Sequence, residues 1–82
     1  MNFFQRRRYR KQVQHLRHAA RHVRHMRGDV AAAADLARLA AAEECLTAAW
    51  TARDAAALEA AAGPLNDAIN QVMPPRGPSW LR

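Results

Sequence analysis

The stretch YRKQVQHLRHAARHV, residues 9–23, decides the fold class of this 82-residue chain. Its apolar side chains recur at alternating steps of four and three residues, as Tyr9, Val13, Leu16, Ala20 and Val23. Such steps keep side chains on one face of an α-helix, which has about 3.6 residues per turn. Residues 2–27 are therefore predicted to form an amphipathic helix whose apolar stripe packs against a partner.

Two alanine-rich segments further along the chain repeat this spacing. The first follows Leu36, Leu39, Ala42, Leu46 and Trp50, and the second follows Leu58, Ala62, Leu65, Ile69 and Val72. Twenty residues are alanine, the strongest helix former, whereas β-branched and aromatic residues are few. We therefore expect an all-α fold, with a long basic N-terminal helix and an antiparallel Ala-rich helical hairpin. The arrangement of the three helices is expected to be loose, with the first helix partly independent.

Capping and breaking residues predict where these helices begin and end. Gly28 is expected to cap the end of the first helix, and either Asp29 or Asp35 to cap the start of the second. Asp54 is the expected N-cap of the third helix. Pro64 lacks a backbone N–H and clashes with the preceding turn, so we expect the third helix to kink or restart there.

The chain divides into three parts of different composition. Residues 1–28 are predicted to form the basic amphipathic helix, residues 29–73 the helical hairpin, and residues 74–82 a Pro-rich extended linker. The first part carries nine of the thirteen Arg and Lys residues and no acid, whereas the rest carries four arginines and all seven acids. A net charge of +9 against −3 indicates a partner that presents phosphates or an anionic membrane surface.

The basic helix is the candidate binding site. Each Lys or Arg near an anionic membrane contributes ~1 kcal/mol of attraction, and interfacial helices commonly add an apolar anchor. The predicted anchor lies at one end of the helix and consists of Phe3, Phe4 and Tyr9. The residues predicted to contact the anionic surface are Arg6, Arg7, Arg8, Arg10, Lys11, Arg17, Arg21 and Arg24.

A row of histidines, His15, His18, His22 and His25, lies on a neighbouring face of the same helix. Two histidines four residues apart can bind one metal ion, but a zinc site needs at least a third ligand. The first helix holds no acid to supply that ligand, and its arginines repel a divalent cation. We therefore interpret the row as a solvated polar face, and expect no metal and no cofactor.

The chain lacks the residues for a catalytic site. Ser79 is the only serine and Lys11 the only lysine, and they lie at opposite ends of the chain. The single cysteine, Cys45, lies beside the acids Glu43 and Glu44 and not beside a cationic group that would activate it. No catalytic residue and no small-molecule substrate are expected. No stretch reaches the ~18 apolar residues of a membrane span.

The layout of the chain resembles the cytosolic extension that precedes the membrane anchor in some bacterial type I signal peptidases. The resemblance covers the whole chain. It rests on the basic opening FFQRRRYRK at residues 3–11, the run of residues 12–29, the Ala-rich pair of helices, and Pro74-Pro75-Arg76. In that family a similar basic helix and hairpin lead, through a junction that contains proline, into a transmembrane helix and a periplasmic catalytic domain.

The resemblance implies that this chain is a fragment that lacks the anchor and the catalytic domain. The family is a group of serine endopeptidases, hydrolases with a Ser–Lys dyad, and that dyad is absent here. Ser79 is followed by Trp80 instead of the methionine of the family's Ser-Met signature. The chain would then lie on the cytoplasmic side of the bacterial inner membrane, held there in part by the positive-inside rule.

Two other classes of function remain open. One is a small basic helical module that binds nucleic acid, although aromatic residues are sparse among its cations. The other is an assembly module in which the second and third segments pair with another chain or self-associate. The expected partners are therefore an anionic membrane surface first, then nucleic acid, then a helical protein. A free-standing chain of either kind would be cytoplasmic.

Overall fold

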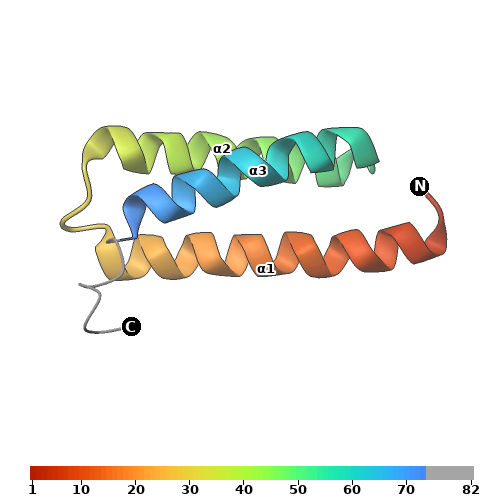
Figure 1. Cartoon of the computed structure of the whole chain (residues 1–82), viewed down its shortest axis with the longest axis horizontal. Helices are drawn as coiled ribbons and strands as arrows, with labels where there is room; N and C mark the ends of the chain where they lie inside the picture. The colour runs from red at the N-terminus through yellow and green to blue at the C-terminus, as the bar shows by residue number, and fades with distance from the viewer. Residues whose placement is uncertain (74–82) are drawn as a thin grey trace, which may run out of the picture.

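The computed structural model describes residues 1–73, which form three helices and no strand (Figure 1). They are α1 (Phe3–Arg27), α2 (Ala33–Thr51) and α3 (Ala55–Val72). The predicted all-α fold is confirmed. The predicted linker at residues 74–82 lies outside the described residues.

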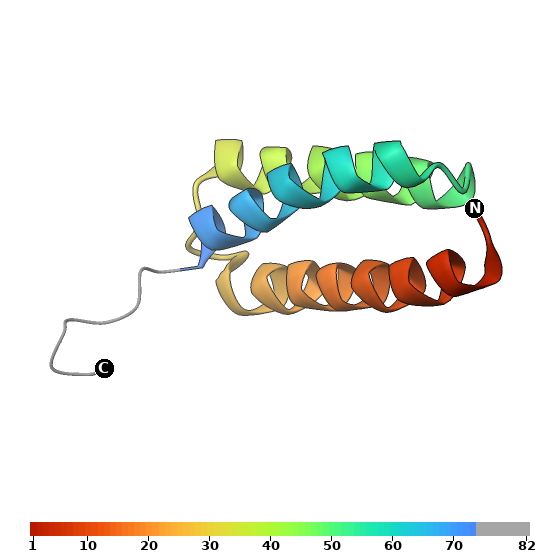
Figure 2. The same ribbon diagram turned by 45° about the vertical axis from the view of Figure 1, so that its right-hand side comes forward.

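The helices run up, down and up, so that α2 and α3 form an antiparallel hairpin and α1 lies alongside it (Figures 1 and 2). Leu39 and Leu46 of α2 and Leu58 and Leu65 of α3 are the largest fully buried side chains. Packing between α2 and α3 is the most extensive, and α1 contacts α3 more than α2. The closest pair in the bundle is therefore the α2–α3 hairpin, and α1 packs against this pair as the third helix.

The apolar stripe of α1 lies entirely in the core. All five of its residues are buried, with exposed fractions between 0% for Ala20 and 8% for Leu16. A helix buried at five positions over four turns is fixed by its packing. The expectation of a partly independent first helix is therefore wrong for this part of α1. Only the first turn extends past the end of the hairpin (Figure 1).

Both ends of α1 are capped. At its start the Gln5 N–H donates to Asn2 Oδ1 at 2.8 Å, and the Asn2 N–H donates to Gln5 Oε1 at 3.1 Å. This reciprocal pair satisfies backbone donors that a helix end leaves free. At the other end the predicted C-cap, Gly28, is confirmed. A Cβ atom there would lie 2.6 Å from the Arg24 carbonyl oxygen, which explains why glycine is needed.

The start of α2 differs from the prediction. Its N-cap is Ala32, whose side chain cannot accept a hydrogen bond, so neither Asp29 nor Asp35 has the predicted role. Asp35 lies inside the first turn, where a carboxylate interacts favourably with the helix dipole. At α3 the prediction is confirmed, because Asp54 Oδ1 accepts from the Ala57 N–H at 3.1 Å.

The turn between α2 and α3 is held by an arginine with a left-handed backbone. Arg53 has φ 54°, a conformation that costs a residue with a Cβ atom about 1 kcal/mol or more. Its guanidinium carbon lies 3.9 Å from the centroid of the Trp50 ring, and Nη1 donates to the Trp50 carbonyl at 2.8 Å. Stacking and hydrogen bonding therefore offset the strain of the turn.

The third helix continues through Pro64 without a restart, so that part of the prediction is wrong. Proline removes the hydrogen bond to the carbonyl of Ala60, four residues earlier. Ala60 and Pro64 are both exposed, so water can hydrate the free carbonyl. Leu58 and Leu65 are buried on either side of this point and hold both halves of the helix against the core.

Candidate anionic-surface site

The exposed side of α1 is the candidate site, and the core packing determines which residues it presents. Because the apolar stripe faces the hairpin, the rest of the helix circumference faces outward. All eight predicted surface-contacting cations are exposed there: Arg6, Arg7, Arg8, Arg10, Lys11, Arg17, Arg21 and Arg24. The four histidines are exposed as well. No acidic residue occurs on α1, so the outward surface carries a single sign of charge.

These cations do not form one uniform patch. Arg6, Arg10, Arg17 and Arg21 follow one edge of the outward surface, whereas Arg8 lies on the opposite edge at ~100° per residue. The guanidinium carbon of Arg8 lies 5.7 Å from the centroid of the Tyr9 ring. Arg8 is thus exposed but directed towards the flank of the bundle.

Arg24 is the predicted contact that the structure places differently. Its guanidinium forms an ion pair and hydrogen bond with the carboxylate of Glu43 on α2. The Glu43 side chain is 22% exposed, so the pair is only partly screened by solvent. An anionic surface would have to compete with Glu43 for this arginine. The sequence alone predicts that Arg24 is free to contact an anionic surface. Because Glu43 holds its guanidinium, Arg24 contributes less to a surface site than predicted.

The first turn of α1 presents two exposed phenyl rings. Phe3 is 71% and Phe4 78% exposed, and their rings pack edge to face with centroids 5.7 Å apart. Exposed aromatic side chains beside cations are typical of helices that lie in a membrane interface. These two residues lie at the end of α1 that extends past the hairpin (Figure 1).

Tyr9, the third predicted anchor residue, does not belong to that apolar end. It is 5% exposed, and its hydroxyl donates to Glu59 Oε1 on α3 at 2.6 Å. The hydrogen bond to Glu59 and the burial of the ring raise the pKa of the Tyr9 phenol. The residue belongs to the core because it continues the stripe, and the predicted anchor is thus reduced to Phe3 and Phe4.

Glu59 was not singled out by the sequence pattern, which indicates an ordinary solvated acid. A tyrosine on a core stripe needs a partner for its hydroxyl, and this requirement is the signal that could have identified it. Glu43 could not be identified in this way, because Arg24 lies on an edge of α1 where several partners are equally consistent with the sequence.

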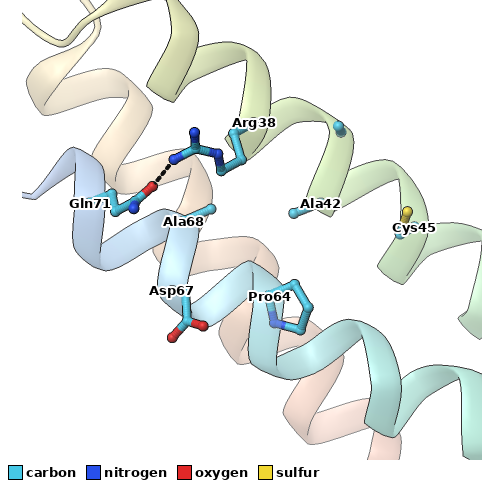
Figure 3. Close-up of a pocket in the computed structure, with 8 residues that line it drawn as sticks. Arg38, Ala42, Cys45, Pro64, Asp67, Ala68 and Gln71 are labelled. Atoms are coloured by element: carbon cyan, nitrogen blue, oxygen red, sulfur yellow. Dashed lines mark hydrogen bonds between the residues drawn. The ribbon is translucent and has the colours of Figure 1, made fainter.

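A hollow of about 620 Å³ lies between α2 and α3 (Figure 3). Small side chains line most of it, Cys45 among them, and Arg38 donates to Gln71 Oε1 across one end. Its polar lining residues include Arg38, Asp67 and Gln71, and residues 1–73 hold no group of three or more potential metal ligands. The lining of this hollow is mostly apolar.

No family model, curated protein or solved structure matches this chain. None of the helices within residues 1–73 is long and apolar enough to cross a membrane. The resemblance to type I signal peptidases therefore stays a prediction from the sequence.

Proposed function

We propose that this chain is the non-catalytic cytosolic segment of a signal-peptidase-I-like membrane protein, and that α1 binds the anionic surface of the membrane. The observation that carries the proposal is the division of α1 into two sides. One side is buried against the hairpin, and the other presents cations and histidines with two exposed phenyl rings at one end.

The charge of α1 suits an anionic membrane. Each of the outward cations contributes about 1 kcal/mol near such a surface, and the contribution falls off within a Debye length, ~8 Å at physiological ionic strength. Cations along one helix axis can all lie within that distance when the helix lies parallel to the surface. Phe3 and Phe4 can then enter the boundary between headgroups and acyl chains.

The bundle also prepares α1 for binding. An isolated amphipathic helix orders its backbone when it reaches the membrane, and this ordering opposes binding. In this structure α1 is already ordered by its five buried residues. Its surface residues are therefore held in register before any contact is made, which favours affinity and a defined orientation.

The position of the aromatic residues favours a membrane over a nucleic acid. Proteins that bind single strands stack successive bases on aromatic side chains placed along a basic groove. On the outward side of α1 the two phenyl rings lie together at one end, and the cations that follow have no aromatic residue among them.

The direct test is sedimentation with vesicles. Wild-type protein is expected to bind phosphatidylglycerol-containing vesicles, to lose affinity as salt rises, and to leave neutral phosphatidylcholine vesicles unbound. The double variant Arg17→Gln/Arg21→Gln should bind much more weakly. Arg38→Gln on α2 is the control for each single variant, Arg17→Gln and Arg21→Gln, because it also removes one charge, from an exposed arginine that does not lie on α1. Equal binding to neutral and anionic vesicles would count against the proposal.

The signal-peptidase part has its own test, the genomic reading frame beyond codon 82. A run of about twenty apolar residues followed by a segment with a Ser-Met pair supports the assignment. A stop codon at that place removes the connection to the enzyme and leaves the vesicle experiment unaffected.

A further inference from the structure

The outward surface of α1 contains two hollows with the same construction. The first has a volume of about 260 Å³ and is lined by Phe3, Arg6, Arg7 and Arg10. The second has a volume of about 290 Å³ and is lined by Gln14, Arg17, His18 and Arg21. In each set the second, third and fourth members follow the first by three, four and seven residues, the spacing of one helix face over two turns.

The second set repeats the first after eleven residues at every position. Eleven residues make almost three full turns, so the two hollows are rotated by only ~20° from each other. At 1.5 Å per residue they lie about 16 Å apart along the helix axis. The two hollows thus lie in one line along the outward edge of α1.

Each hollow presents two arginines four residues apart, Arg6 with Arg10 and Arg17 with Arg21. A guanidinium carries five N–H donors in a planar fork that matches phosphate oxygens, and pairs of this kind are stronger than neutral hydrogen bonds. No acidic residue lines either hollow. The walls therefore supply donors and positive charge without an internal partner for them.

The size of the hollows suits a small anion. A water molecule occupies about 30 Å³ in the liquid, and a phosphate group of five heavy atoms needs a few times that volume. At the start of α1 the N–H groups of Asn2 and Gln5 are already bonded to each other's side chains, and the arginine side chains supply the charge that lines the first hollow. The second hollow lies in the middle of α1, where no helix end exists.

We infer that each hollow binds one phosphate group, and that at the membrane these are the phosphates of two lipid headgroups. This inference rests on the proposed function and specifies its ligand. Phe3 forms one wall of the first hollow, so a phosphate bound there lies beside an apolar ring that can contact the acyl chains. A phosphomonoester headgroup offers more free oxygens than a phosphodiester, and phosphatidate is therefore the preferred lipid.

The experiment compares vesicles that contain phosphatidate with vesicles that contain phosphatidylserine at matched surface charge. The variants are Arg6→Gln/Arg10→Gln for the first hollow and Arg17→Gln/Arg21→Gln for the second. The control is Arg8→Gln/Lys11→Gln, which removes the same charge from exposed positions of α1 that line neither hollow. Circular dichroism should show the same helix content for all variants, because every substituted side chain is exposed.

Wild-type protein and the control are expected to prefer phosphatidate. Each hollow variant should bind phosphatidate vesicles at least about tenfold more weakly than the control does, the loss expected from one charge-assisted hydrogen bond. On phosphatidylserine vesicles, whose phosphodiester offers fewer free oxygens, the hollow variants should differ less from the control. If they are equal on both vesicle types, the phosphate sites are overturned while membrane binding stands. Failure of the wild type to bind any anionic vesicle overturns the proposed function itself.

A titration with inorganic phosphate separates a lipid headgroup from a free ion. The side-chain N–H resonances of Arg6, Arg10, Arg17 and Arg21 should shift only weakly, because a free ion lacks the surface that concentrates the lipid. Saturation at low phosphate concentration without a preference for phosphatidate vesicles would overturn the lipid assignment. Tighter binding to duplex DNA than to phosphatidate vesicles at the same salt concentration would do the same.

Discussion

The hydroxyl of Tyr9 on α1 donates to Oε1 of Glu59 on α3 at 2.6 Å, and this contact joins residues fifty positions apart in the sequence. This hydrogen bond between side chains connects the basic helix to α3. Tyr9 also contributes its ring to the core. Removal of the hydroxyl alone therefore separates the polar contact from the packing.

Tyr9→Phe is expected to fold and to melt up to about 5 °C below the wild type, because it leaves the ring in place and deprives Glu59 of its donor. Tyr9→Ala should melt lower still, since it also opens a cavity. Thermal unfolding followed by circular dichroism measures both. Equal melting temperatures for wild type and Tyr9→Phe would show that water replaces the hydrogen bond without loss.

The pKa of Tyr9 gives a prediction in alkaline solution. The hydrogen bond to Glu59 and burial raise the phenol pKa in the folded protein above the value of about 10 in the unfolded chain. Because the folded state favours the protonated phenol, this group contributes its full stabilisation below pH ~10. The contribution is lost as the pH rises through the phenol pKa of the folded protein. The stability advantage of wild type over Tyr9→Phe should therefore narrow in this range.

Ultraviolet titration of the phenolate measures this pKa directly, because Tyr9 is the only tyrosine. Its midpoint should lie above that of the same protein in denaturant. A midpoint that is the same in both states, or lower in the folded protein, would contradict the hydrogen bond to Glu59.

Leu65→Ala is expected to lower the free energy of unfolding by about 2–5 kcal/mol. Leu65 is fully buried, at 0% exposure, and the shortened side chain leaves a cavity between the helices. For so small a domain this is a large part of the total stability. The matched control is Val30→Ala, at a residue that is 65% exposed, which should change stability by less than about 0.5 kcal/mol.

Arg53→Gly and Arg53→Ala should differ at the turn between α2 and α3. Both variants lose the stacking on Trp50. Glycine adopts the left-handed backbone conformation of residue 53 without strain, whereas alanine keeps the strain. Arg53→Gly should therefore be about 1 kcal/mol more stable than Arg53→Ala. Chemical denaturation of the two variants provides the comparison, and a reversed order would show that Arg53 does not hold a strained turn.

Arg24→Gln should weaken binding to anionic vesicles less than Arg21→Gln does. Both arginines are exposed on α1, but Arg24 is paired with Glu43, and Arg21 lines the second hollow. Loss of Arg21 removes about 1 kcal/mol of attraction to the surface. Arg24 contributes less because Glu43 holds its guanidinium, although the Glu43 carboxylate freed by its loss repels the surface and narrows the difference between the two variants. Titrations of both variants with the same vesicles would separate these effects.

The sequence predicts the core best where its apolar residues are large and well spaced. On α1 all five predicted residues are buried, and on α3 Leu58, Leu65, Ile69 and Val72 are buried as predicted. In α3 the buried alanine is Ala68, whereas the predicted Ala62 is only half-buried. Because alanines occupy several faces of the Ala-rich helices, the pattern there does not specify which alanine faces the core.

On the second helix the prediction is incomplete even for large apolar residues. Leu39 and Leu46 are buried as predicted, whereas Leu36 and Trp50 are only half-buried and lie at the margin of the core. The prediction for the start of α2 is also wrong, since Asp29 and Asp35 both favour an N-cap but the helix begins after Ala32, whose side chain makes no capping hydrogen bond.

For the candidate site, the sequence predicts which helix is charged but not which of its side chains are paired with residues of the other helices. The charge of a residue can be read from its identity, whereas a partner such as Glu43 or Glu59 depends on how helices far apart in the sequence are rotated against each other. Tyr9 was assigned to both the core and the anchor because spacing alone satisfies both roles. Only the packing of α1 on α3 distinguishes them.

The buried stripe of α1 has a consequence for how this surface can change by mutation. Because the stripe fixes the rotation of the helix about its own axis, it also fixes the direction in which each arginine faces. Insertion of one residue between Arg10 and Arg17 would turn everything that follows by ~100° relative to everything before it. In a regular helix one half of the stripe would then leave the core, and the two arginine pairs would face different directions. Single substitutions of the outward arginines therefore leave the core unchanged. The number of residues between those arginines, in contrast, is constrained by the packing of the stripe in the core.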